Sequence, residues 1–210
     1  MNEIIQQAMT AIYGADAQAR TEAIAVFSDN RYQPAAAVLS EILPDVDPGT
    51  RYLIVKALGN IAHEDGLSAL FEALRYDDIW TRSAATGAII NIGTERAVNG
   101  LLEALRDENK AVRRAAAKAI GKIGIEQGAD HPQYGAILQG LSAALLDVDH
   151  GVRRFSAEAL GRIQASDKVQ ELTELLEDTV SEVRIAAFKA LTSLNTPEAQ
   201  AAVRRWSTGH

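Results

Sequence analysis

A repeat is the feature that most constrains how this chain folds. Similar segments begin at six arginines, which follow one another at spacings of 31, 31, 31, 40 and 31 residues. The arginines are Arg20, Arg51, Arg82, Arg113, Arg153 and Arg184. A unit of this length cannot bury its apolar face alone, so we expect successive units to stack on one another into a solenoid.

Each unit reads as two helices. After the arginine, apolar residues recur at the spacing of one helical face, as in Ala57, Leu58 and Ile61 of the second unit. Before the arginine, five units carry leucines at twelve and eight residues' distance, whereas the first unit has Ala8 and Ile12 there. We call the upstream helix A and the downstream helix B. An atypical first unit is expected at the end of a solenoid.

The composition agrees with packed helices, because Ala, Leu, Ile and Val dominate the 47% apolar share and aromatic residues make up only 5%. We therefore predict an all-α, right-handed α-solenoid of six helical hairpins in a single domain, residues 1–210. The hairpins are expected at 1–31, 32–62, 63–93, 94–124, 134–164 and 165–195. An insert at 125–133 is expected to lengthen one loop, and Thr196 before Pro197 predicts a capping helix that ends near residue 206.

The turns between helices A and B carry aspartates at two recurring positions. Asp16, Asp47, Asp78 and Asp149 lie four residues before the arginine, and Asp45, Asp107, Asp147 and Asp178 lie six residues before it. An aspartate in the first position can cap the N-terminus of helix B. Because the Asp and Arg positions recur along the chain, we interpret them as a structural network of caps and hydrogen bonds between units.

Two segments show the repeat most clearly, DENKAVRRAAAKAIGKIG and DVDHGVRRFSAEALGRIQ. Their pattern, Asp, then Val-Arg, then A-x-x-A-(L/I)-G-x-I, resembles the short HEAT-like repeats of the phycobilisome lyase family. The resemblance extends over nearly the whole chain, and the motif that carries it is structural.

The resemblance implies work on open-chain tetrapyrroles, since these lyases and related phycobilisome degradation proteins attach, remove or handle bilins on phycobiliproteins. It implies phycocyanobilin or another bilin as a ligand, and a phycobiliprotein subunit and a second HEAT-like lyase subunit as partners. The chain would then be a lyase subunit or a chaperone; no catalytic residue is identified. The other hypothesis is a non-enzymatic scaffold that binds an acidic partner protein.

The face of helix B opposite its apolar stripe contains the candidate binding residues. In the fourth and fifth units this row is basic, and in the second and third it is neutral apart from one lysine. The candidates are Tyr52, Lys56, Ser83, Asn91, Arg114, Lys118, Arg154, Glu158 and Arg162. Such a row could bind bilin propionates or an acidic protein surface.

Two further residues near this row are singled out. Gly87 lies inside a predicted helix, where glycine costs about 1 kcal/mol relative to alanine, so we expect a ligand or a packed side chain beside it. Trp80 precedes it in a turn, and indole rings are favoured anchors at interfaces.

Other classes of function are disfavoured. The net charge of −7 opposes binding to nucleic acid, including that of a HEAT-like DNA glycosylase. The chain has no cysteine, which excludes a bilin bound covalently through its own sulfur and agrees with a cytoplasmic protein. No two of its four histidines have the spacing of a helical metal pair, and no apolar stretch is long enough to span a membrane.

Overall fold

A computed structural model describes residues 3–209, and all regular secondary structure in that range is helical. The chain divides into two compact units, residues 1–97 and 98–210, with the division inside α7 (Glu95–Ala104). The prediction of an all-α solenoid of stacked hairpins is confirmed. The prediction of one domain over 1–210 stays a prediction.

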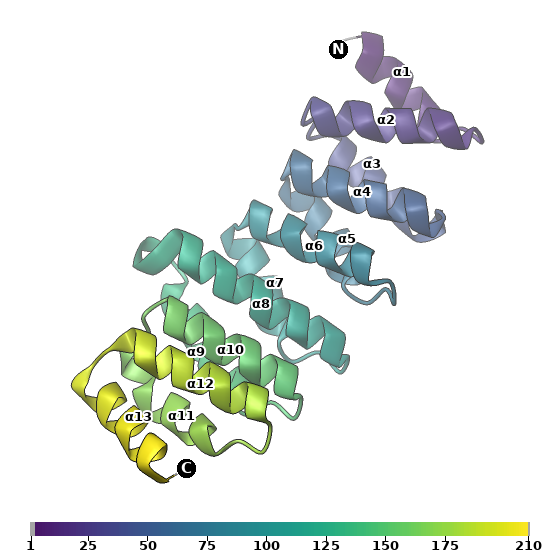
Figure 1. Cartoon of the computed structure of the whole chain (residues 1–210). Helices are drawn as coiled ribbons and strands as arrows, with labels where there is room; N and C mark the ends of the chain where they lie inside the picture. The colour runs from purple at the N-terminus through teal and green to yellow at the C-terminus, as the bar shows by residue number, and fades with distance from the viewer. Residues whose placement is uncertain (1–2, 210) are drawn as a thin grey trace. The chain divides into compact units, whose positions relative to one another are not determined.

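In the first unit, helices A and B alternate, and the B helices α2, α4 and α6 lie side by side (Figure 1). The helices of this unit are α1 (Glu3–Ala11), α2 (Ala17–Asp29), α3 (Ala35–Ile42), α4 (Pro48–Ile61), α5 (Leu67–Ala73) and α6 (Ile79–Ile92). Short 3₁₀ turns follow two of them, η1 (Leu43–Asp45) and η2 (Glu64–Gly66).

The second unit continues the alternation, with α8, α10 and α12 side by side and α13 packed against α11 and α12 (Figure 1). Its helices are α8 (Lys110–Gln127), α9 (Tyr134–Ala144), α10 (His150–Arg162), α11 (Val169–Glu174), α12 (Ser181–Leu194) and α13 (Pro197–Gly209). Its 3₁₀ turns are η3 (Gly128–Asp130), η4 (Ser166–Lys168) and η5 (Leu175–Glu177).

The periodic apolar residues form the core, as their spacing predicted. The leucines twelve residues before each arginine are fully buried, and so are the large residues seven after it. These are Leu39, Leu70, Leu101, Leu141 and Leu172 on the A helices, and Phe27, Leu58, Ile89, Ile120, Leu160 and Leu191 on the B helices. In the first unit, Ala8 and Ile12 are buried in the places that leucines take elsewhere.

The aspartates four residues before the arginines begin the B helices. Each accepts a hydrogen bond from the backbone N–H two or three residues later, for example from Gly49 N to Asp47 Oδ1 at 3.0 Å and from Thr81 N to Asp78 Oδ1 at 2.7 Å. Asn109 takes this role in the fourth repeat. The predicted helix caps are confirmed, because these side chains satisfy N–H groups that have no partner inside the helix.

The repeated arginine binds the turn that precedes it. In five repeats one guanidinium nitrogen donates to the carbonyl oxygen six residues upstream, at 2.6 to 2.8 Å. The donors are Arg20, Arg82, Arg113, Arg153 and Arg184, and Arg51 donates instead to the carbonyl oxygen of Val46 at 3.1 Å. Each arginine therefore joins its helix B to the turn that precedes it.

In the second unit the same arginines also join neighbouring repeats. Arg113 forms a bidentate ion pair with Asp147, with N···O distances of 2.8 and 3.0 Å. Arg153 forms another with Asp178, at 2.7 and 2.9 Å. The four side chains are only 10 to 15% exposed, so these two ion pairs should stabilise the fold more than ordinary surface ion pairs do. In the first unit Arg51 instead stacks on the ring of Tyr76, 4.2 Å from its centroid.

Adjacent B helices approach closely where a glycine faces an alanine. A Cβ added to Gly59 would lie 2.8 Å from the Cβ of Ala88, and one added to Gly161 would lie 2.6 Å from the Cβ of Ala190. Gly121 faces Ala159 in the same way. These glycines keep the helix axes close, so the interpretation of repeat-spaced glycines as packing residues is confirmed at these positions.

Two predicted boundaries differ in the structure. The insert 125–133 is not all loop, because α8 continues through its first three residues to Gln127 before η3 begins. The capping helix α13 runs to Gly209, past the predicted end at 206, and Thr196 Oγ1 accepts from Ala199 N at its start.

Substitutions at two glycines should have opposite effects on stability. Gly161→Ala forces the Cβ against Ala190 and should lower the free energy of unfolding by about 1–3 kcal/mol. Gly87→Ala should raise it by about 0.5–1 kcal/mol, because a Cβ there meets nothing within 4 Å and alanine favours the helix. Urea unfolding followed by circular dichroism measures both; a loss of stability in Gly87→Ala would show that the glycine is needed for the fold.

Asp149 should make the fold sensitive to acid. Its hydrogen bonds from Arg114, at 2.6 and 2.7 Å, and from the start of α10 lower its pKa from 3.8 to about 2. The pairing therefore stabilises the fold above pH 3.8 and is lost as the pH falls through 2, an effect of about 1–2 kcal/mol.

The measurement is the urea-unfolding free energy at pH 6 and pH 2. Between pH 6 and pH 2 the unfolding free energy of wild type should fall more than that of Asp149→Asn. The Arg114→Gln variant should likewise show a smaller fall than wild type. Equal losses in all three proteins would contradict this role for Asp149.

Candidate functional site

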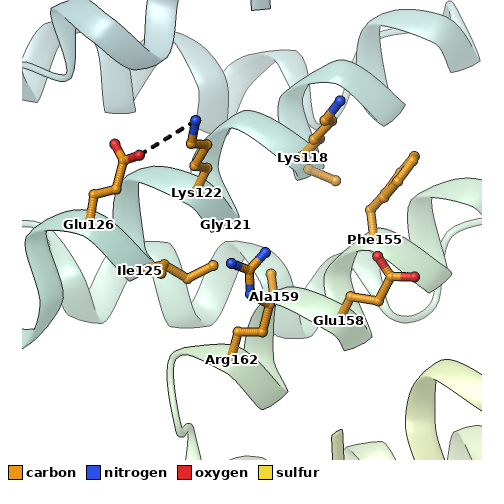
Figure 2. A pocket seen from close by; sticks show the side chains of 10 residues that line it. Lys118, Gly121, Lys122, Ile125, Glu126, Phe155, Glu158, Ala159 and Arg162 are labelled. Atoms are coloured by element: carbon orange, nitrogen blue, oxygen red, sulfur yellow. Dashed lines mark ion pairs between the residues drawn. The ribbon is translucent and has the colours of Figure 1, made fainter. Parts of the chain in front are cut away.

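A groove lies between the B helices α8 and α10 in the second unit. Its volume is about 340 Å³, and Figure 2 shows the side chains that line it. Its lining residues are Ala117, Lys118, Gly121, Lys122, Ile125 and Glu126 from α8, and Phe155, Glu158, Ala159 and Arg162 from α10. The neighbouring helices α8 and α10 therefore supply the whole groove.

The floor of the groove is apolar and consists of small side chains. Where α8 and α10 are closest, Gly121 faces Ala159, and neither residue has a side chain large enough to rise above this contact into the groove. Ile125 and Phe155 lie toward opposite ends of this floor (Figure 2). The result is a surface that suits a flat apolar group, because large side chains border it and do not cross it.

Three cations border this floor. Lys118 and Arg162 are exposed, and no ion pair within residues 3–209 uses either of them. Lys122 lies 3.5 Å from Glu126 on the same helix, and both side chains are about half exposed. Lys118 and Arg162 thus keep their charges for a ligand, while Lys122 shares its charge with a carboxylate.

Glu158 is the second carboxylate of the groove. Arg154 donates to it at 2.9 Å, and the same guanidinium lies 4.3 Å from the ring centroid of Phe155. The predicted candidates Lys118, Glu158 and Arg162 are therefore brought together in one groove, and Arg154 is paired at its border.

Arg114 belongs to the same predicted basic row, but its guanidinium is paired with a carboxylate of this protein. It forms a bidentate ion pair with Asp149. The same carboxylate caps α10 by accepting hydrogen bonds from Gly151 N and Val152 N. The pairing raises the pKa of Arg114 through the hydrogen bond from its side chain to Asp149. The spacing of residues along helix B predicts which way the Arg114 side chain points. It does not predict that Asp149 of the next repeat binds that side chain.

The remaining candidates lie on α4 and α6 of the first unit. Tyr52 is half-buried, and the ammonium of Lys56 is 5.5 Å from its ring centroid. Ser83 is exposed on α6, and Asn91 donates from Nδ2 to the carbonyl oxygen of Gly59 at 2.6 Å. Asn91 therefore joins two B helices as well as facing solvent.

Trp80 and Gly87 are both exposed on α6. Trp80 is 73% exposed in the first turn of the helix, and its neighbour Ile79 is 66% exposed. No side chain packs on Gly87, so the expected contact that would offset the cost of a helical glycine is not found among the described residues. These two positions stay predictions as binding residues.

Several residues of the groove were not among the predicted ones. Ile125 and Glu126 belong to the insert, which the sequence predicts to be a loop, and Phe155 lies one position beyond the predicted row of helix B. Outside the groove, on α12, Lys189 and Ile185 are exposed at positions equivalent to Lys118 and Arg114. The same row, continued into the sixth repeat, contains both of these residues.

Two other kinds of site were sought in the part of the chain that the structure describes. Residues 3–209 contain no group of three or more His, Asp or Glu side chains able to hold a metal ion. No helix within that range is both long and apolar enough to cross a membrane.

Solved structures with the same fold include natural and designed repeat proteins. A chain of the complex of CpcE and CpcF of phycocyanin lyase from Nostoc sp. PCC7120 has a TM-score of 0.57 and 21% identity, covering 75% of this chain and 98% of that chain. A chain from a structure of microtubule plus-end tracking by XMAP215, CLIP-170 and EB1 has a TM-score of 0.64 and 18% identity, covering 97% and 90%.

A designed armadillo repeat protein in complex with the peptide (KR)4 has a TM-score of 0.54 and 20% identity, covering 92% of this chain and 100% of that chain. At these identities the similarity concerns the fold. No curated protein sequence is similar enough to this chain to count as a match.

The family assignment comes from the sequence profile of HEAT repeats, which matches residues 5–90, 77–132 and 136–208. The matches cover most of both units and agree with the alternating A and B helices. The chain therefore belongs to the HEAT-repeat family.

Proposed function

We propose that this HEAT-repeat chain is a binding subunit that takes up a bilin, or the bilin-carrying part of a phycobiliprotein, in the groove between α8 and α10. The observation that carries the proposal is the combination of a flat apolar floor with the unpaired cations Lys118 and Arg162 at its border. Such a subunit would assist the attachment, removal or turnover of the chromophore.

The chemistry of a bilin matches this groove. A bilin has a conjugated apolar body and two propionate side chains. The body would lie on the floor over Gly121 and Ala159, and the propionates would meet Lys118 and Arg162, where charge-assisted hydrogen bonds are stronger than neutral ones.

Two comparisons support the choice of ligand. The repeat motif resembles that of the phycobilisome lyase family, and the fold is similar to that of a chain in the phycocyanin lyase complex. Since that structure is a complex of two proteins, a second HEAT-like subunit is part of the proposal.

The absence of cysteine from the sequence limits the mechanism. The chain cannot hold a bilin through a thioether, so the acceptor sulfur would belong to the phycobiliprotein. The contribution of this chain would be to hold the bilin in a reactive orientation, which lowers the barrier by positioning.

A second candidate is a scaffold that binds an acidic segment of another protein. The exposed Lys189 and Ile185 on α12 favour it, because they continue a basic and apolar surface beyond the groove. The designed armadillo protein in complex with (KR)4 is an example of a similar fold that holds a charged peptide. An acidic peptide would suit the present surface by the same kind of charge complementarity.

A titration with phycocyanobilin tests the first candidate. Wild type should produce saturable changes in visible absorbance and circular dichroism, and the double variant Lys118→Glu, Arg162→Glu should bind at least about tenfold more weakly because two attractive charges become repulsive. The double variant Lys110→Glu, Arg204→Glu is the matched control, since it changes the same charge at exposed positions outside the groove.

The outcomes separate the two candidates. Equal bilin affinity in the two double variants would place the ligand elsewhere. If wild type binds no bilin, either alone or with a phycobiliprotein subunit, and an acidic peptide binds with dependence on Lys118 and Arg162, the scaffold is the correct function.

A further inference from the structure

We infer that Glu126 and Glu158 determine which anions the groove accepts, by excluding polyanions and admitting an apolar ligand with one or two carboxylates. This inference deepens the proposed function, since it concerns the same groove and rests on it for the identity of the ligand. It follows from where the two carboxylates lie and from which cations they hold.

Glu126 reaches the groove because of the insert. The B helix α8 has 18 residues, against 13 in α10 and 14 in α12, and its extra turn contains Ile125 and Glu126. Both residues line the groove (Figure 2). The irregularity in the repeat therefore adds one apolar residue and one carboxylate to a single site.

Each carboxylate neutralises one cation at the edge of the groove. Glu126 holds Lys122 at 3.5 Å, and Glu158 holds Arg154 at 2.9 Å. Both pairs are partly exposed, with 35 to 55% of each side chain accessible, so they are weak and can exchange partners. A ligand carboxylate that approaches Lys122 or Arg154 must displace a glutamate.

The charge that remains is small. Together with Arg154, which pairs with Glu158 at the border, four cations and two carboxylates leave two net positive charges beside an apolar floor. A nucleic acid gains affinity by neutralising phosphates at many sites along its backbone, and each glutamate removes one such site and repels the next phosphate. A ligand with one or two carboxylates needs only Lys118 and Arg162, which no glutamate holds within the described chain.

The test compares a polyanion with a small carboxylate. A fluorescein-labelled oligothymidylate is titrated, at low salt and with fluorescence anisotropy as the readout, into wild type and the double variant Glu126→Gln, Glu158→Gln. The variant should bind the oligonucleotide about tenfold more tightly than wild type, with a steeper loss of affinity as salt is added, because it frees Lys122 and Arg154.

The control is the double variant Glu103→Gln, Glu174→Gln. It makes the same change in net charge at exposed carboxylates outside this groove, and it should bind the oligonucleotide as weakly as wild type does. Thermal unfolding checks that all three proteins are folded. An equal gain in the control, or no gain in the Glu126→Gln, Glu158→Gln variant, would overturn the inference.

Phycocyanobilin is titrated into the same proteins as the second probe. If the oligonucleotide result is as expected and no protein binds the bilin, the selection by charge stands and the proposed function fails. If wild type binds the bilin and removing the glutamates gains no affinity for the oligonucleotide, the proposed function stands and this inference fails.

Discussion

The close approach of neighbouring B helices is the constraint on which the rest of each unit depends. Gly59 faces Ala88, and Gly161 faces Ala190, at separations that leave no room for a further methyl group. This spacing allows an asparagine or a serine on one helix to reach a carbonyl oxygen on the next, as Asn91 and Ser193 do. It also makes the floor between α8 and α10 flat, since only Gly121 and Ala159 meet there.

Much of the fold could be predicted because the same pattern of apolar, aspartate and arginine positions recurs in successive repeats. The buried leucines, the aspartate caps and the arginines of the turns all follow from spacing within one hairpin. The length of α8 could not, because the break in repeat spacing does not show that Ile125, Glu126 and Gln127 continue the helix before Gly128 ends it. Local propensity is a weak guide at such a boundary.

The candidate site was harder to predict than the fold, since it depends on pairing between repeats. Arg114 and Lys118 lie one turn apart on the same face of α8, yet Arg114 is bound to Asp149 and Lys118 has no ion-pair partner among residues 3–209. A sequence row gives the direction of each side chain. Which charges remain for a ligand is decided by carboxylates 25 to 35 residues away, as in the pairs of Arg114 and Arg153.

The contact of Arg51 with Tyr76 differs from the ion pairs of the second unit in how it responds to acid and salt. In the second unit, the corresponding arginines meet carboxylates, whose attraction weakens when protons are added and, at exposed edges, when salt is added. In the first unit an aromatic ring face takes that place. The attraction of a ring face for a guanidinium does not depend on a titrating group, so this contact persists in acid, whereas the attraction between Arg51 and the carboxylate of Asp78 weakens there.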